Sequence, residues 1–120
     1  MSIEDLLKQL VAQIKGANGA IVLETDGEAV QWHPVADADR LRLRGAYAAL
    51  ALNACRASAI RGEIGIIRSL ILKYEHASLV VQEIDRDCFV VVELGLSANI
   101  AHALFHLEPV LDKLRDELEL

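Results

Sequence analysis

The chain has 120 residues, the usual size of one domain, of which 53% are hydrophobic and 25% charged, so a disordered protein is excluded. The net charge of −6 and the 4% of aromatic residues argue against nucleic-acid binding, and the apolar runs are too short for membrane insertion. The two cysteines, Cys55 and Cys88, form no CxxC motif, and we expect reduced thiols in a cytoplasmic protein.

The N-terminal segment is predicted to form a helix. Ser2 and Asp5 have the spacing of a capping box, and Gly16 is suited to end the helix. Between these positions apolar residues recur at helical spacing, which predicts one buried stripe. The stripe consists of Ile3, Leu6, Leu7, Leu10, Val11 and Ile14.

A β-hairpin is predicted next. We interpret the pair Asn18-Gly19 as a turn, followed by a short, apolar and partly β-branched strand at residues 20–23. The pair Asp26-Gly27 is a strong hairpin signal, and residues 29–32 form the returning strand.

A second helix is predicted over about residues 39–61, with Asp37 or Asp39 as N-cap and Gly62 at its end. Three strands follow, at residues 64–74, 77–84 and 88–94. Because their connections are short, they form an antiparallel meander.

A third helix, capped by Ser97, completes the chain. The order of elements is helix, hairpin, helix, three-stranded meander, helix, which predicts one α+β domain over residues 1–120 with a five-stranded antiparallel sheet. The expected buried stripe of the third helix is Ile100, Ala103, Leu104, Leu107, Val110, Leu111, Leu114 and Leu118.

The second helix has two apolar stripes on opposite sides, at about 100° per residue. A helix lying on one sheet needs only one such stripe, so the other must face something else. Its small residues would let another helix approach closely, although alanine is also simply a good helix former. One stripe is Leu41, Ala48, Leu52 and Ala59, and the other is Leu43, Leu50, Ala54 and Ala57 with Tyr47 at its border.

The same helix carries five of the chain's 12 basic residues and no acid between Asp39 and Glu63. A solvated helix face explains such a run. The sharper interpretation is a docking surface for an acidic protein partner. The candidate partner-binding residues are Arg40, Arg44 and Arg56, with Arg42 as a fourth whose face can turn toward the sheet.

The sequence contains no assembled catalytic motif. It lacks a GxxxxGK[ST] or GxGxxG loop and any nucleophile–base signature, so we predict no enzyme and no cofactor. His102 and His106 are spaced i, i+4, but a third ligand is missing and the pair falls opposite the apolar stripe, so we predict no metal site. Cys88 lies in an apolar strand, which indicates core packing.

Two segments resemble the Roadblock/dynein light chain family, and the order of elements resembles it over nearly the whole chain. The stretch GANGAIVLETDGEAV is similar to the family's opening, a helix-end turn and a hairpin. The stretch LVVQEIDRDCFVVVELGLSANIAHAL is similar to its last strands, which lead through a short loop to the terminal helix. The second helix, rich in small residues, fits as well.

The resemblance implies helices on both faces of the sheet, the first and third on one face and the second on the other. It implies a homodimer, or a heterodimer with a paralogue, joined through the third strand and the second helix. It also implies a non-enzymatic module that regulates or scaffolds a small Ras-like GTPase, as bacterial members of the MglB type do. The expected dimer residues are Leu43, Tyr47, Leu50, Ala54, Ala57, Ile66, Arg68 and Leu70.

The alternative is a small-molecule sensor, because profilin-like folds with a similar order of elements also hold ligand pockets. A sensor needs a cavity lined by convergent polar groups. An interaction module needs a filled core and a flat exposed patch. An enzyme is a third possibility, which the missing motifs disfavour.

Overall fold

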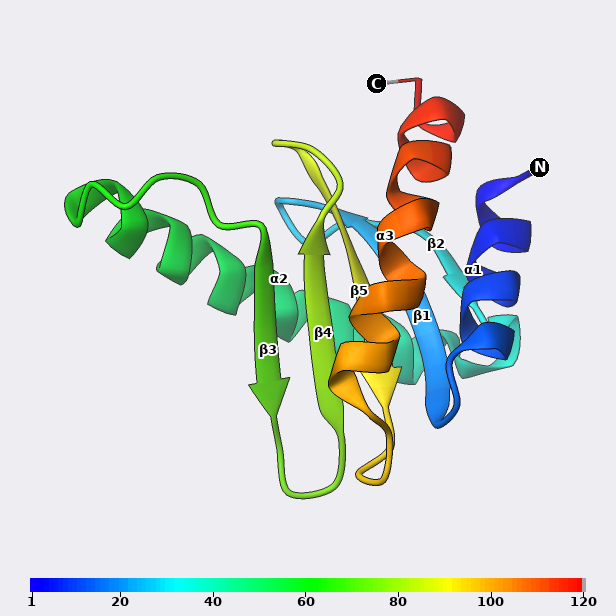
Figure 1. Cartoon of the computed structure of the whole chain (residues 1–120). Helices are drawn as coiled ribbons and strands as arrows, with labels where there is room; N and C mark the ends of the chain where they lie inside the picture. Colours follow the sequence, from blue (N-terminus) through cyan, green and yellow to red (C-terminus); the bar gives the residue numbers. More distant parts are fainter. Residues whose placement is uncertain (120) are drawn as a thin grey trace.

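The computed structural model describes residues 1–119 and contains one five-stranded antiparallel sheet with helices on both faces (Figure 1). The strand order is β2-β1-β5-β4-β3, so β2 and β3 are the edges. The predicted α+β class and sheet are confirmed. In chain order the elements are α1 (Ile3–Gln13), β1 (Ala17–Glu24), β2 (Ala29–His33), the 3-10 helix η1 (Val35–Asp37), α2 (Ala38–Arg61), β3 (Ser69–Lys73), β4 (Ser78–Glu83), β5 (Cys88–Leu94) and α3 (Ile100–Glu117).

The sheet separates two apolar layers. Helices α1 and α3 cover one face and α2 crosses the other, as the resemblance implied (Figure 1). Neighbouring residues of β5 point to opposite faces, so Val90 packs with α1 and α3 while Phe89 packs with α2. Strands β1 and β5 are apolar at nearly every position because both of their faces are covered.

The capping box of α1 is present. The Ser2 hydroxyl accepts a hydrogen bond from the Asp5 backbone N–H (3.1 Å), and the Asp5 carboxylate accepts one from the Ser2 N–H (3.3 Å). These hydrogen bonds lower the pKa of Asp5. The helix ends at Gln13, earlier than predicted, because Ile14 leaves helical geometry and turns into the core.

The predicted turn at Asn18-Gly19 is wrong, because both residues lie inside β1 at a shift in its register with β5. Gly19 is buried under α2. A Cβ at this position would come within 2.7 Å of Leu41 Cδ2, so the glycine allows the helix to approach the strand.

The long third strand predicted over residues 64–74 is also wrong, since β3 begins only at Ser69. Gly65 has a φ of +108°, which interrupts the extended backbone, and the pairing with β4 covers only Ser69–Lys73. Residues 64–68 therefore have no strand structure. Of the expected dimer residues, Ile66 and Arg68 lie in this segment and Leu70 lies in β3.

Both later helix caps differ in detail from the prediction. Asn99, not Ser97, caps α3, because its side-chain oxygen accepts the His102 N–H at 3.0 Å. Asp37 is the N-cap of α2 but makes no side-chain capping bond; its carboxylate pairs with Arg40 at 3.2 Å instead. Gly62 ends α2 as predicted.

Candidate functional site

Helix α2 lies close on its face of the sheet because the residues that face the strands are small. Gly45, Ala48 and Ala49 are buried there beside the larger Leu41 and Leu52. A Cβ on Gly45 would come within 2.5 Å of Leu23 Cδ2, so the helix has no room for a larger residue.

The opposite side of α2 is apolar and open to solvent. The structure buries the first predicted stripe and exposes the second, whose most prominent members are Leu50 (69% exposed) and Tyr47 (56% exposed). Ala54 and Ala57 are exposed on the same side.

The exposed stripe continues beyond the helix. Of the eleven large hydrophobic residues that are exposed among residues 1–119, seven lie on α2 or between α2 and β4, which is a patch rather than a scatter. We refer to this patch as the α2–β3 surface. It comprises Leu43, Tyr47, Leu50, Ala54, Ala57, Ile60, Ile64, Ile66 and Tyr74.

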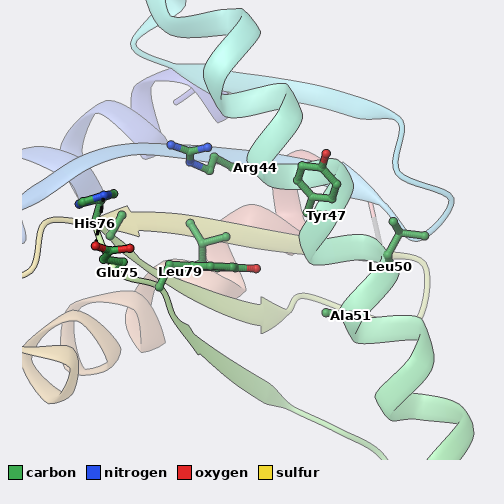
Figure 2. Close-up of a pocket in the computed structure, with 9 residues that line it drawn as sticks. Arg44, Tyr47, Leu50, Ala51, Glu75, His76 and Leu79 are labelled. Carbon is green, nitrogen blue, oxygen red and sulfur yellow. Dashed lines mark ion pairs between the residues drawn. The ribbon is translucent and has the colours of Figure 1, made fainter.

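An open groove of about 820 Å³ runs between α2 and the β3–β4 hairpin (Figure 2). Tyr47, Leu50 and Ala51 line it from the helix, while Tyr74 and Leu79 line it from the hairpin. Its other lining residues are Ala77 and three charged or polar ones at one end, Arg44, Glu75 and His76. The lining is mostly apolar, and Glu75 and His76 are almost fully exposed rather than enclosed, which favours an interaction surface over a sensor cavity.

The arginines of α2 are engaged with the sheet. Arg44 Nε lies 2.8 Å from one carboxylate oxygen of Glu93, and Arg40 Nε lies 3.1 Å from the other. The Glu93 side chain is only 5% exposed, so this is a nearly buried carboxylate held by two guanidinium groups.

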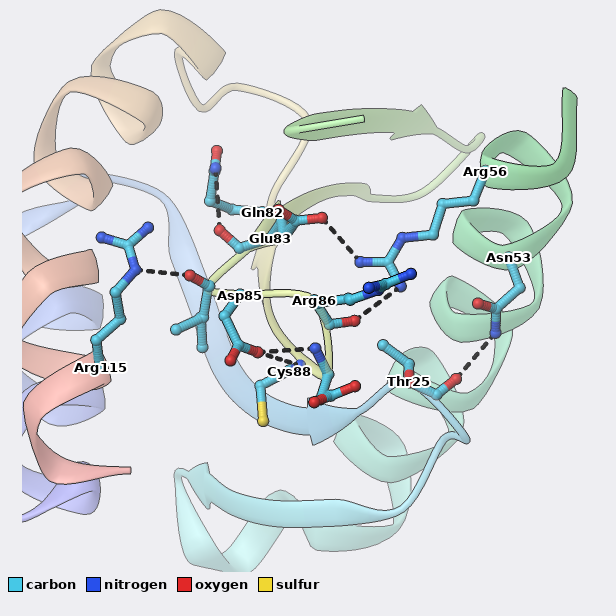
Figure 3. A network of polar contacts seen from close by, with 11 residues as sticks. Thr25, Asn53, Arg56, Gln82, Glu83, Asp85, Arg86, Cys88 and Arg115 are labelled. Atoms are coloured by element: carbon cyan, nitrogen blue, oxygen red, sulfur yellow. Dashed lines mark hydrogen bonds and ion pairs between the residues drawn. The ribbon is translucent and has the colours of Figure 1, made fainter. Parts of the chain in front are cut away.

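A second polar anchor lies on the other flank of the helix (Figure 3). Arg56 donates to the Glu83 carboxylate at 3.0 Å and to the Arg86 carbonyl at 3.3 Å. The Asn53 side chain donates to the Thr25 carbonyl at 2.9 Å. The structure therefore brings Arg40 and Arg44 together and places Arg56 apart from them.

Arg42 is positioned differently. Its guanidinium lies 5.7 Å from the ring centre of Trp32, a cation–π contact with the edge strand β2. Among residues 1–119 it has no ion pair with a carboxylate, and its side chain is exposed. Whether any of the four arginines contacts a partner stays a prediction.

The sequence analysis missed Glu83 and Glu93. The signal was present for Glu93, an acidic residue inside an otherwise apolar strand that follows Phe89 and Val91 on the face toward α2. Glu83 gave a weaker signal, because it is the last residue of β4 and follows the polar Gln82. An acid at such a position is expensive to bury unless a base pairs with it.

Two turn aspartates and Cys88 have structural surroundings. Asp26 and Asp85 accept backbone N–H groups within their own turns, at 2.9 Å from Glu28 and 2.8 Å from Asp87. Cys88 is buried, as predicted; burial raises the pKa of its thiol, and the neighbouring carboxylates add to the effect. A thiol in this state is a poor nucleophile.

Two other groups could in principle hold a metal. His102 and His106 are in edge-to-face contact, with ring centres 4.4 Å apart. Within the described part of the chain, Glu24, Asp26 and Glu28 form the one group of three possible ligands, and all three are exposed. Exposed acids in a turn are ordinary solvated charges.

The arrangement of three helices on this sheet is similar to that of known structures. A Roadblock/LC7 domain from Streptomyces avermitilis superimposes with a TM-score of 0.90 at 21% identity, over 100% of both chains. The chain has the Roadblock/LC7 fold. Two further similar structures come from Myxococcus xanthus. MglB superimposes with a TM-score of 0.85 at 12% identity, over 98% of this chain and 94% of the MglB chain. MglC superimposes with a TM-score of 0.68 at 26% identity, over 98% of this chain and 99% of the MglC chain.

At the level of sequence, no protein-family model and no curated protein matches the chain. The likeness to Roadblock/LC7 domains lies in the fold and in patterns of turns and hydrophobicity. Within residues 1–119, no helix of this fold is both long and apolar enough to cross a membrane.

Proposed function

We propose that residues 1–120 form a Roadblock-type domain that self-associates through the α2–β3 surface and acts as a non-enzymatic interaction module. The module regulates or scaffolds a small Ras-like GTPase. The observation that carries the proposal is the α2–β3 surface itself, because a monomer would leave these exposed apolar residues in water.

The edge position of β3 supports self-association. An edge strand presents unpaired backbone N–H and C=O groups, which another chain can satisfy. Pairing β3 with its copy would join two sheets and bring the exposed stripes of two α2 helices together. The alanines at positions 54 and 57 would allow those helices a close approach.

The GTPase part of the proposal rests on the resemblance to MglB-type members and on the similarity to the MglB and MglC structures. In this arrangement the partner sits against the paired α2 helices. Arg40, Arg42, Arg44 and Arg56 remain the candidate contacts, and Arg42 is the most available of them because no carboxylate pairs with it within residues 1–119. We further propose a cytoplasmic location, because Cys55 and Cys88 are unpaired thiols.

Self-association is tested with a matched pair of leucines. Leu50 is 69% exposed on the α2–β3 surface, and Leu96 is 64% exposed in the loop before α3. In sedimentation equilibrium at micromolar concentration we expect a dimer for the wild type and for Leu96→Asp, and a monomer for Leu50→Asp. A monomeric wild type would contradict the proposal.

The regulatory role is tested with the small Ras-like GTPases of the source cell. Each is purified, and its rates of GTP hydrolysis and of fluorescent GDP release are measured with and without the chain. We expect the dimer to bind a GTPase or to change one of these rates, and the Leu50→Asp monomer to do so more weakly. The chain alone is expected to hydrolyse no GTP.

The groove beside α2 keeps a small-molecule sensor as the second candidate, since it is large enough for a ligand. A ligand there would occupy the same surface as the second copy. If the chain is a sensor, its monomer should bind an apolar compound in the groove, and dimerisation should prevent that binding.

A further inference from the structure

The contact between α2 and the sheet is smooth at its centre, where small residues lie between Leu41 and Leu52. Gly45, Ala48 and Ala49 supply the centre of the helix's buried stripe, and they have no long side chains to interlock with the strands. Helix orientation normally follows from ridges of side chains that fit into grooves. Small residues make those ridges shallow at the centre of the helix, where Leu23 packs against Gly45, so polar contacts at the flanks add to what sets the rotation of α2.

Ion pairs flank this smooth contact on both sides. At about 100° per residue, Arg44 lies about 80° to one side of the middle of the buried stripe and Arg56 about 40° to the other. The two arginines are also about 18 Å apart along the axis. Arg44 reaches Glu93 on β5, and Arg56 reaches Glu83 on β4.

The two carboxylates lie on the face of the sheet toward α2, in line with apolar residues of their strands. Glu93 continues the row of Phe89 and Val91 toward α2, and Glu83 continues the row of Leu79 and Val81. Each pairs with an arginine of the helix, so the charge of these arginines is balanced by the sheet. The outward stripe between them is left apolar and uncharged.

We propose that Glu93 and Glu83 are positioning residues, which fix the rotation of α2 on the sheet and thereby the direction in which its exposed stripe faces. Two anchors on opposite flanks resist turning in both directions, whereas one anchor would act as a pivot. The binding surface is then an apolar ridge held in place by ion pairs. Of the two measurements that test this proposal, the dimer dissociation constant depends on the proposed self-association and the Trp32 emission does not.

A charge-swap cycle at the isolated pair tests the proposal. We expect Arg56→Glu and Glu83→Arg each to raise the dimer dissociation constant at least tenfold, and the double variant to return it to within about threefold of the wild type. Far-ultraviolet circular dichroism checks that each variant is folded, and Glu83→Gln replaces Glu83→Arg if that variant does not fold.

The control is Glu108→Gln, an exposed acid on α3 that has no ion pair within residues 1–119. It should leave the dissociation constant unchanged. If Arg56 instead contacts the partner directly, the double variant will bind as weakly as Arg56→Glu alone. That outcome would overturn the positioning role.

A second readout does not depend on self-association. Trp32, the only tryptophan, packs against the α2 layer, and Arg42 of α2 lies over its ring. In the monomeric Leu50→Asp background we expect Glu93→Gln to shift the Trp32 emission to longer wavelength, because the N-terminal half of α2 turns away from the ring. Glu108→Gln should leave the emission unchanged.

The two readouts separate the possible failures. A wild-type monomer would contradict self-association, and the Trp32 emission would then decide the role of Glu93. A folded Glu93→Gln variant with unchanged emission would overturn the proposal even if the wild type is a dimer.

Discussion

The two faces of the sheet are built from the same strands but are covered by different numbers of helices. Helices α1 and α3 together cover one face with a layer of leucines, including Leu7, Leu10, Leu107 and Leu114. A single helix covers the other face and is held by small residues at its centre and ion pairs at its flanks. The first face is closed, whereas the second leaves the groove and the α2–β3 surface open.

This difference shows how one domain separates stability from binding. The α1/α3 layer buries large side chains completely, and such burial supplies most of the free energy of folding. The α2 layer buries less and exposes more. Helix α2 closes its own apolar layer on one side and presents an apolar face to solvent on the other, and ion pairs hold it at the flanks.

The largest expected effect compares one leucine from each layer. Leu10→Ala should lower the free energy of unfolding by about 4 kcal/mol, because the cavity lies between two helices and the sheet and cannot collapse. Leu52→Ala should cost nearer 2 kcal/mol, because α2 borders solvent and can settle into the space. Urea denaturation of both variants in the monomeric Leu50→Asp background measures the difference. Equal losses would show that α2 is held as rigidly as α1 and α3.

A smaller effect is expected where α2 approaches the sheet most closely. The Gly45→Val variant places a side chain against buried Leu23, since even a Cβ at position 45 would lie 2.5 Å from Leu23 Cδ2. The substitution should lower the free energy of unfolding by about 2 kcal/mol. The neighbouring Ala46 is exposed, so Ala46→Val is the matched control and should change stability by less than about 0.5 kcal/mol. Gly45→Val should also weaken self-association, because it lifts the helix from its anchors. A stability equal to that of Ala46→Val would mean that the close contact is not needed.

The layered architecture could be predicted from sequence because each layer has its own periodicity. The helical stripes, the short apolar strands and the two stripes of α2 follow directly from hydrophobic spacing. Spacing alone predicts that α2 has two opposite stripes, and the structure buries one of them and exposes the other.

What the sequence could not show depends on contacts between distant residues. The apolar run at residues 64–68 resembles a strand, yet a strand requires a neighbour, and β4 offers none there. The pairing of Arg44 with Glu93 joins residues 49 positions apart, so the arginines looked like an unpartnered basic face. For this reason the positions of the candidate arginines were predicted but their engagement with the sheet was not.

The start of α3 offers a finer comparison, in which two candidate caps lie two residues apart. Asn99→Ala should lower the free energy of unfolding by about 1 kcal/mol, because it removes the acceptor for the His102 N–H. Ser97→Ala should leave stability unchanged, since Ser97 lies in the preceding turn. Thermal denaturation of both variants measures this. A larger loss of stability for Ser97→Ala than for Asn99→Ala would show that Ser97 is the cap, as predicted from the sequence.

The smallest expected effect compares the two cysteines, one in each layer. Cys88 is buried under α3 with a raised pKa, while Cys55 is half-buried on α2. At pH 8 a thiol reagent such as dithionitrobenzoate should modify Cys55 first, and Cys88 only as the chain opens. Because the folded chain holds the Cys88 proton more tightly than the unfolded chain, the thiol's contribution to stability is complete below its ordinary pKa of 9.0 and decreases as the pH rises above that value. The Cys88→Ala variant should lose this part of the alkaline decrease, whereas Cys55→Ala should keep it. Rapid labelling of Cys88 in the folded wild type would show that the α1/α3 layer opens as readily as the α2 layer, and the contrast between the two faces would then be wrong.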